Sequence, residues 1–367
     1  MKVAIIGSRG YPVVYSGYET FVSNVAPQLV KNGIEVHIYC HKNLFLQKPQ
    51  QLNGVRLHYM PVISSKSLSQ LSNSFCSTIH ALFTGFDVIL YVNVANGLFG
   101  IFPKIMGVKT AINVDGLEWL RPKWKGLGSK IFYLSAKLAT RWMSSIITDA
   151  EEMRIIYLRE FNKDSTVIAY GATIRESKEK SLIKKWNLVP REYYLIVGRL
   201  IPDNNAEFII NEFVLSQSDK RLVIVGDVPY KDKYASNLKL IKDDRLIFTG
   251  HINDQDELAE LYHNCFVYLH GHEFGGTNPT LLKALAYGCA ILAIDTLFSR
   301  EVLLNEEYGM YFEKKKDALK IIFDQLKLNY TNLDIYREKS RNRIIQNYTW
   351  DKISSEYEKL FKSMVQE

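Results

Sequence analysis

The sequence predicts an α/β fold made of two parallel-sheet domains. Short apolar runs alternate with helical stretches along the chain, and this alternation restarts after about residue 170. The length of 367 residues also exceeds what one hydrophobic core usually holds. We therefore expect an N-terminal domain over 1–170, a C-terminal domain over 171–349 and a last helical segment over 350–367.

The N-terminal half starts with a strand over 3–6 and a helix over 20–31. Asn32-Gly33 follows that helix as a stop signal. Further strands are expected at 36–40, 87–94, 109–115 and 145–150. Helical stretches between them make crossover connections, which a parallel sheet requires.

The C-terminal half repeats this pattern. Strands are expected at 193–199, 221–227, 245–250, 265–270 and 289–295, with helices at 205–216 and 279–287 and a last amphipathic helix at 350–364. The domain junction is expected near 165–185. Because ligands of such folds bind beyond the carboxyl ends of the strands, the loops after strands are where chemistry is expected.

Composition narrows the class of protein. The chain is 47% hydrophobic and 23% charged, with a net charge of +7 spread along its length. That spread predicts no nucleic-acid partner, whereas an anionic substrate or a membrane surface fits a mild excess. Asp87, Asn93 and Asn96 interrupt the most apolar region, so no membrane span is expected. We expect a cytoplasmic protein, bound peripherally at the inner face of the plasma membrane.

Metal and disulfide chemistry are not indicated. The four cysteines (Cys40, Cys76, Cys265 and Cys289) are far apart and lack metal spacing, which favours buried reduced thiols. We expect neither a cofactor nor a metal.

Two glycine-rich turns come early in the chain, at Gly7-Ser8-Arg9-Gly10 and around Gly17. Glycines after the first strand let backbone approach a ligand, and the following helix start favours anions. The G-x-G-x-x-G dinucleotide spacing is absent. A phosphate or sugar contact and an ordinary tight turn both remain open.

Two loops of the C-terminal half indicate a diphosphate site. Arg199 directly follows a buried strand, and its planar fork suits two phosphate oxygens. In the other loop, Glu273 precedes a helix start formed by Gly275, Gly276, Thr277 and Asn278, where anions are stabilised. Glu273 could hydrogen-bond sugar hydroxyls. A surface arginine and a purely structural turn are the alternatives.

The N-terminal half offers an acid and a basic, aromatic segment. Asp115 follows a strand and could face the cleft as a sugar contact or a base, or it could be a turn aspartate. The segment 119–142 combines cations and aromatics, which fits either an interfacial membrane patch or a solvated helix. The residues assigned to acceptor or membrane contact are Trp119, Arg121, Lys123, Trp124, Lys125 and Lys130, together with Lys66.

Read together, these motifs resemble glycosyltransferase family 4, the retaining GT-B enzymes. The segments VGRLIPDNN, RLIFTG, EFGGTNPTLLKALAYG and YTWDKI fall in the family's order, and the resemblance covers essentially the whole chain. The segments IGSRGYP, SGYETFVSN, NVANG and NVDGLEW look more narrowly like bacterial cell-surface β-1,4-rhamnosyltransferases. Such enzymes act in capsule or rhamnan assembly. The resemblance implies two Rossmann-like domains facing across a cleft, with the C-terminal helix packing back towards the N-terminal domain.

The resemblance also implies residue roles. Gly17 would approach the donor phosphate, and Arg199 would bind the diphosphate. Glu273 would face the donor sugar, and Asp115 matches a catalytic aspartate. The other donor contacts would be Asn204, Asn205, Phe248, Gly250, His251, Gly275, Gly276, Thr277, Asn278 and Lys283.

Three positions depart from the family pattern. Asn204 stands where relatives carry a lysine, and Val114 stands where many carry a histidine. Lys283 stands where a second glutamate normally grips both ribose hydroxyls. A thymidine diphosphate donor lacks the 2′-hydroxyl, so loss of that glutamate is easier to tolerate. Lys283 could add the charge that Asn204 does not provide.

The predicted function is retaining, metal-independent transfer of L-rhamnose from dTDP-β-L-rhamnose. The acceptor is expected to be a lipid-diphosphate-linked glucose or N-acetylglucosamine. Three alternatives remain: a UDP-glucosyl or UDP-galactosyl transferase of the same fold, a non-catalytic nucleotide-binding regulatory protein, and a dinucleotide-dependent oxidoreductase. The missing fingerprint weakens the last.

Overall fold

The structure of the protein is a computed structural model that describes residues 1–12, 17–65, 68–122, 124, 126–228, 232–328 and 333–366. The chain forms two compact units. Unit 1 comprises Met1–Gly171 and Trp350–Glu367, and unit 2 comprises Ala172–Thr349. The last helix therefore belongs with the N-terminal residues.

Unit 1 is built on an eight-stranded sheet. The strands are β1 (Lys2–Ile6), β2 (Glu35–His41), β3 (Gln51–Leu52), β4 (Val55–Met60), β5 (Val88–Val92), β6 (Lys109–Val114), β7 (Ser145–Thr148) and β8 (Thr166–Val167), in the order β3-β4-β2-β1-β5-β6-β7-β8. All neighbours pair in parallel except β3 with β4. The predicted parallel sheet is confirmed.

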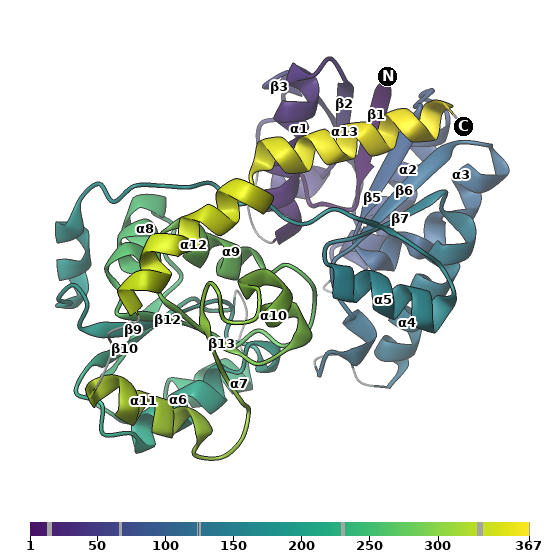
Figure 1. Ribbon diagram of the computed structural model, residues 1–367. Coiled ribbons are helices and arrows are strands. Elements are labelled where there is room, and N and C mark those ends of the chain that lie inside the picture. The colour runs from purple at the N-terminus through teal and green to yellow at the C-terminus, as the bar shows by residue number, and fades with distance from the viewer. Residues whose placement is uncertain are drawn as a thin grey trace. The chain divides into compact units, whose positions relative to one another are not determined.

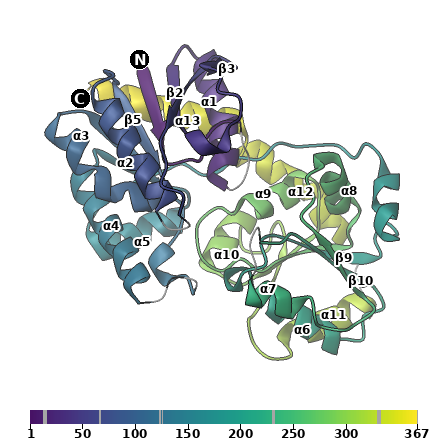
Figure 2. The ribbon, with the colours of Figure 1, turned by 180° about the vertical axis from the view of Figure 1, so that it is seen from behind.

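Helices cover both faces of this sheet (Figures 1 and 2). They are α1 (Gly17–Lys31), α2 (Ser69–Leu82), α3 (Ile101–Ile105), α4 (Leu127–Trp142), α5 (Glu151–Phe161) and α13 (Trp350–Gln366), with short 3₁₀ turns at Lys42–Leu44, Val94–Phe99 and Glu118–Leu120. Strands β1 and β5 are continuous apolar runs because layers on both faces bury them.

Helix α13 packs back onto unit 1, as the sequence predicted. The Tyr357 ring lies 5.0 Å from the Phe21 ring of α1, between centroids. The Tyr357 hydroxyl also accepts a 2.6 Å hydrogen bond from the Asn113 amide at the end of β6. The yellow helix in Figure 1 runs beside α1, so the chain's end completes the fold of its beginning.

Unit 2 has a six-stranded, fully parallel sheet. The strands are β9 (Tyr193–Val197), β10 (Arg221–Val225), β11 (Leu246–Gly250), β12 (Val267–His270), β13 (Ile291–Ile294) and β14 (Met310–Phe312), in the order β11-β10-β9-β12-β13-β14. The five strands predicted for this half are all present, with ends that differ by up to two residues. The short β14 was not predicted.

Two helical layers enclose this sheet, as both views show (Figures 1 and 2). One layer holds α6 (Ala206–Leu215), α7 (Lys233–Leu238) and α11 (Ala318–Leu328), and the other holds α8 (Gln255–Asn264), α9 (Pro279–Ala286) and α12 (Leu333–Asn347). The remaining elements are α10 (Leu297–Leu303) and 3₁₀ turns at Lys180–Trp186 and Pro202–Asn204. The core includes Tyr194, Phe213 and Phe323, whose rings pack edge to face.

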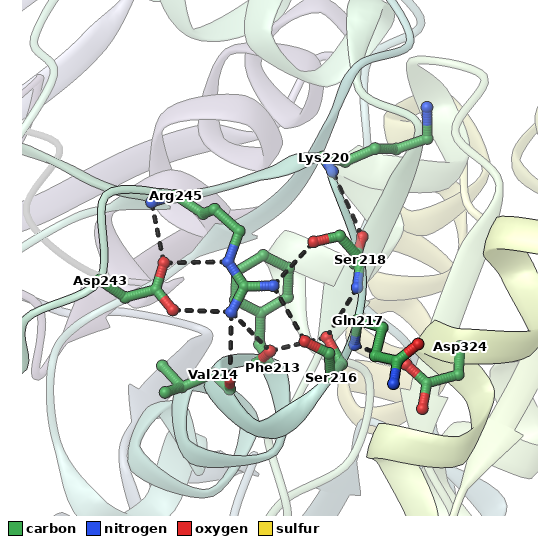
Figure 3. Close-up of polar contacts among 9 residues, drawn as sticks. All are labelled: Phe213, Val214, Ser216, Gln217, Ser218, Lys220, Asp243, Arg245 and Asp324. Carbon is green, nitrogen blue, oxygen red and sulfur yellow. Dashed lines mark hydrogen bonds and ion pairs between the residues drawn. The ribbon is translucent and has the colours of Figure 1, made fainter.

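The Arg245 side chain donates hydrogen bonds to backbone carbonyls at the carboxyl end of α6 (Figure 3). Its guanidinium donates hydrogen bonds to carbonyl oxygens of Val214 at 3.0 Å, Ser216 at 3.0 Å and Ser218 at 2.7 Å. Asp243 fixes the same group through a 2.7 Å contact. Helix ends leave carbonyls without intrahelical partners, so this arginine stabilises the start of β11 and the end of α6 together.

Candidate active site

Glycines line the carboxyl edge of the unit 2 sheet. Gly198, Gly226 and Gly271 directly follow β9, β10 and β12, and Gly250 ends β11. A Cβ atom on Gly226 would lie 1.9 Å from the Gly198 carbonyl oxygen, and one on Gly271 would lie 2.4 Å from the Asn204 carbonyl oxygen. Only glycine fits at such distances, so neighbouring loops come together as bare backbone. The Gly198 and Gly226 N–H groups donate to the Val225 and Gly250 carbonyls at 3.0 and 2.8 Å, which ties these loops together at the edge where the sequence predicts an anionic ligand.

Arg199 lies at this edge, one residue after Gly198. Its side chain is exposed and makes no hydrogen bond or ion pair with the residues that the structure describes. The Arg199 carbonyl, by contrast, accepts a 2.8 Å hydrogen bond from the Asn204 amide. The backbone is therefore fixed while the guanidinium remains available for a ligand.

Asn204 and Asn205 join the loops after β9 and β12. The Asn204 side-chain oxygen lies 2.9 Å from the His272 Nδ1. Asn205 adopts the left-handed backbone region with a φ of 52°, and its amide donates to the Gly271 carbonyl at 2.8 Å. Both side chains thus connect the two loops. Their contact with the sugar-nucleotide donor stays a prediction.

Glu273 is held at the same edge by two donors. Its Oε2 accepts hydrogen bonds from the Asn205 amide at 3.0 Å and from the Lys314 Nζ at 2.7 Å. Lys314 follows β14 and was missed, because it stands in a run of lysines that gives no reason to select one. The ammonium balances the carboxylate charge and orients it.

The segment Gly275–Asn278 leads into α9, as the sequence predicted. Asn278 caps the helix, since its Oδ1 accepts a 2.9 Å hydrogen bond from the Thr280 N–H. Gly275 has a φ of 119°, which only glycine adopts readily. Gly275, Gly276 and Thr277 are buried beside this helix start.

Lys283 lies on α9, one turn after that helix start. It is partly buried and forms no ion pair with a described carboxylate. Burial lowers the pKa of Lys283, and the charge of Arg175 lowers it further. An anion beside this ammonium would offset both effects.

The predicted nucleobase region forms strand β11 at the edge of the sheet. Phe248 is partly buried and packs against the hydrophobic core of unit 2. Gly250 has a φ of 70° and open space where a side chain would lie. His251 is exposed just beyond it. Nothing in these contacts tests nucleobase binding, which stays a prediction.

Asp115 follows β6 in unit 1 and is bound by two tyrosines. Its Oδ2 accepts a 2.8 Å hydrogen bond from the Tyr170 hydroxyl, and its Oδ1 accepts one from the Tyr18 hydroxyl. Burial raises the pKa of Asp115, while the Tyr18 hydrogen bond and the charge of Arg121 counteract the rise. Both tyrosines were missed as site residues, although Tyr18 stands beside Gly17 and Tyr170 marks the predicted junction.

Gly17 begins α1, directly before Tyr18. On the same helix Glu19 is buried, and its Oε1 accepts a 2.9 Å hydrogen bond from the Arg9 N–H in the loop after β1. A Cβ atom on Gly7 of that loop would lie 2.2 Å from the Val92 carbonyl oxygen. Packing therefore explains Gly7, whereas the proposed phosphate contact of Gly17 stays a prediction.

The residues predicted to contact the acceptor or the membrane differ in their exposure to solvent. Arg121 is only 9% exposed and forms a 3.0 Å ion pair with Glu118, so it is not part of an exposed membrane patch, and its predicted acceptor contact stays a prediction. Trp119 packs its ring against Tyr133, Tyr157 and Phe161. Trp124 and Lys130 are exposed. Lys66, Lys123 and Lys125 lie outside the described residues.

Helix α4 also carries an exposed apolar stripe, which was not predicted from the sequence. Leu127, Ile131 and Leu134 share one helix face and are 73%, 44% and 48% exposed. Exposed cations at Lys130, Lys137 and Arg141 accompany them. The combination is typical of a helix that lies on an anionic lipid surface.

The described residues show no sign of a metal site, a membrane span or a disulfide. No group of three or more His, Cys, Asp or Glu side chains among the described residues could hold a metal ion. Among the same residues, no helix combines the length and apolar character needed to cross a bilayer. All four cysteines are free thiols.

Two family models match the chain. Residues 178–349 match the family described as glycosyl transferases group 1, and residues 1–55 and 89–173 match a domain of unknown function (DUF1972). The first match covers most of unit 2. The finer resemblance to family 4 and to rhamnosyltransferases remains a hypothesis.

Two curated proteins are similar to this chain. An uncharacterised glycosyltransferase of Methanocaldococcus jannaschii is 25% identical, with 99% of each chain covered. The N-acetylgalactosamine-N,N'-diacetylbacillosaminyl-diphospho-undecaprenol 4-alpha-N-acetylgalactosaminyltransferase of Campylobacter jejuni is 24% identical over 41% of this chain and 42% of its own.

Solved structures establish the overall architecture. Sucrose-phosphate synthase from Thermosynechococcus elongatus matches with a TM-score of 0.83 at 16% identity, covering 99% of this chain and 98% of that one. Anabaena HepE in complex with UDP-glucose matches with a TM-score of 0.77 at 14% identity, covering 99% and 100%. At such identities the likeness concerns the fold alone. The GT-B fold predicted from the sequence is confirmed.

Proposed function

We propose that the protein is a retaining glycosyltransferase whose nucleotide-sugar donor binds at the carboxyl edge of the unit 2 sheet. The observation that carries this proposal is the exposed Arg199 guanidinium, which has no partner among the described residues and follows a glycine-lined edge. The glycosyl transferases group 1 match of the same unit supports it. Glu273 lies at the same edge and would hydrogen-bond the donor sugar.

The main chemical task is to stabilise the charge that develops on the leaving diphosphate. Preorganised cations and backbone N–H groups supply such stabilisation, and losing one donor typically costs about 10²-fold or more in rate. Arg199, the helix start at Gly275–Asn278 and Lys283 would do this without a metal. The acceptor hydroxyl would attack from the face that the diphosphate leaves. Retention from a β-L-rhamnosyl donor would give a β-L-rhamnoside.

For the donor we propose dTDP-L-rhamnose, because Lys283 replaces the glutamate that grips both ribose hydroxyls in related enzymes. The HepE complex with UDP-glucose favours a UDP-sugar as the second candidate. Lys283→Glu separates the two. The substitution should strengthen binding of uridine diphosphate relative to thymidine diphosphate, measured by titration calorimetry. An unchanged ratio of the two dissociation constants would remove Lys283 as the donor-selecting residue.

For the acceptor we propose a lipid-diphosphate-linked sugar at an anionic membrane. The exposed apolar stripe of α4 supports this, as does the undecaprenol-linked substrate named for the Campylobacter jejuni relative. Replacing Leu127, Ile131 and Leu134 with serine should abolish flotation with vesicles containing phosphatidylglycerol. Leu240→Ser in unit 2, where the side chain is 74% exposed, is the matched control. Flotation that survives the triple substitution would contradict the α4 surface.

A donor and acceptor screen tests the whole proposal. The full chain is incubated with dTDP-rhamnose, UDP-glucose, UDP-galactose and UDP-N-acetylglucosamine, with synthetic lipid-linked glucose or N-acetylglucosamine as acceptors. We expect glycosylated lipid with one donor and its loss in Arg199→Ala. No turnover with any pairing would favour a nucleotide-binding protein without transferase activity.

A further inference from the structure

A second cationic site lies in unit 2, beyond the amino ends of the strands. The candidate donor site lies beyond their carboxyl ends. A cavity of about 490 Å³ opens between the Lys180–Trp186 turn, the end of α8, the end of α9 and α12. Arg191, which lines it, precedes β9, and Gly288, which also lines it, precedes β13. The cavity therefore lies at the amino ends of the strands, away from Arg199 and Glu273.

Two arginines are anchored side by side in this cavity. The Arg191 guanidinium donates to the Cys265 carbonyl at 2.6 Å, and the Arg337 guanidinium donates to the Phe266 carbonyl at 2.6 Å. These carbonyls are consecutive along the chain, so the two cations are held close. Burial lowers the pKa of Arg191, and the charge of Arg337 lowers it further.

The backbone at Arg191 is held in an unfavourable conformation. Its φ of 65° lies in the left-handed region, which costs an ordinary residue about 1 kcal/mol. A 2.8 Å hydrogen bond from the Arg191 N–H to the Asn264 carbonyl keeps the residue there. Residues held in this way concentrate at binding sites.

The charges in the cavity wall are strongly unbalanced. Lys180, Arg191, Arg337 and Arg341 line it, against Glu338 as the one lining carboxylate among the described residues. The carboxylates that pair with Arg337 and Arg341 are Asp334 and Glu176, whose side chains are 81% and 74% exposed. Such solvent-exposed pairs contribute little and leave a net positive wall.

Two buried nitrogens in the cavity wall have no hydrogen-bond partner among the described residues. The His263 Nε2 and the Arg337 Nε are buried and bond to no other described residue. His263 is 9% exposed and stacks on the Tyr287 ring at 5.3 Å between centroids. Buried polar atoms in proteins are normally satisfied, so these two point to a bound polar group.

We propose that this cavity binds the phosphate or diphosphate group of a small anionic ligand. Planar guanidinium forks match phosphate oxygens two at a time, which neutral or carboxylate-rich walls do not. The volume falls within the range of about 300–1,000 Å³ typical of small-molecule sites. The site is separate from the donor edge, so it provides a place where a phosphorylated metabolite or a lipid headgroup binds without displacing the nucleotide sugar.

The test is calorimetric titration of the full chain with inorganic pyrophosphate at low ionic strength. Arg199→Ala is used as the background, because it weakens anion binding at the candidate donor site. Lys180→Gln combined with Arg341→Gln removes two cavity charges without touching the anchors at Cys265 and Phe266. We expect the double substitution to weaken pyrophosphate binding by about tenfold or more. Thermal unfolding of the variants checks that the fold is retained.

Arg221→Gln is the matched control. Arg221 is an exposed arginine at the start of β10, at the same edge of the same sheet, and it does not line the cavity. It should leave pyrophosphate binding unchanged. The proposal is overturned if the Arg199→Ala background binds no pyrophosphate, or if the cavity variant and the control bind it equally.

Vesicles containing phosphatidylglycerol distinguish the two sources of phosphate. If the cavity variant binds vesicles as the unsubstituted chain does, the natural ligand is a soluble phosphorylated molecule. If it loses vesicle binding, the ligand is a lipid headgroup.

Discussion

Each unit presents one acidic residue beyond a central strand of its sheet, and the two acids are held in different ways. In unit 1, Asp115 accepts hydrogen bonds from two uncharged hydroxyls, those of Tyr18 and Tyr170. In unit 2, Glu273 accepts from an amide and from the Lys314 ammonium. Two acids at the carboxyl ends of strands in similar sheets, after β6 and after β12, therefore have different electrostatic environments.

The difference indicates a division of labour. Asp115 accepts hydrogen bonds from uncharged donors, and burial raises its pKa. A raised pKa suits a carboxyl group that accepts or donates a proton during the reaction. An acid paired with lysine is oriented as an ionised acceptor, which suits holding sugar hydroxyls. We therefore expect Asp115 to act in turnover and Glu273 to act in donor binding.

The strongest test of this division is removal of the Asp115 charge. Asp115→Asn should lower kcat by about 10²-fold, because a positioned acid or base typically contributes that much. The donor KM should change little. Asp164→Asn, at an exposed carboxylate of the same unit, is the control. A variant whose main defect is a higher KM would contradict the assignment of Asp115 to turnover.

Lys314 provides the corresponding test in unit 2. Lys314→Met should raise the donor KM by about tenfold, since a hydrogen bond to a charged group is worth about 1.5–3 kcal/mol. Steady-state kinetics with varied donor would measure it. Lys315→Met, next in the chain and paired only with exposed Glu313, should have no effect. Equal effects of the two substitutions would mean that Lys314 acts merely through net charge.

A smaller effect is expected from Tyr170→Phe. The lost hydroxyl stabilised the ionised form of Asp115, so the pKa of Asp115 should rise further. The acid limb of the kcat/KM profile should then move to higher pH, with activity reduced several-fold at lower pH. Tyr193→Phe, at a buried tyrosine of unit 2 that donates to the Leu261 carbonyl, is the control. An unshifted acid limb would show that Tyr170 does not change the pKa of the reacting acid.

The smallest expected effect concerns stability at the edge of unit 1. His58 lies 2.7 Å from the His37 Nδ1, near His80, Lys2 and Arg56, and burial followed by the charge of His37 lowers its pKa to about 4. The unfolded chain takes up a proton near pH 6.5. The folded chain does not, so the free energy of unfolding falls as the pH drops from about 6.5 towards 4.

His58→Gln should make this loss of stability with acid shallower, without abolishing it, because His37 and His41 in unit 1 also have lowered pKa values. Urea unfolding across that pH range measures the slope. An unchanged slope would show that His58 is not part of the acid response.

The sequence predicted the parallel sheets and the loops that carry Arg199, Glu273 and Asp115, because buried strands and glycine turns leave a local pattern. It could not predict what holds these residues. Tyr18 and Tyr170 are 152 positions apart in the chain yet meet at Asp115, and Lys314 reaches Glu273 across 41 positions. Arg121 was placed in the exposed patch, yet folding buries it beside Glu118, three positions earlier in the chain.

The most direct test of the account is titration of the full chain with uridine and thymidine diphosphates, comparing Arg199→Ala with Asp115→Asn. If the nucleotide binds to unit 2 as proposed, Arg199→Ala should weaken binding by about tenfold or more, while Asp115→Asn should leave it intact. Binding that survives Arg199→Ala but fails in Asp115→Asn would contradict the assignment of the donor to unit 2.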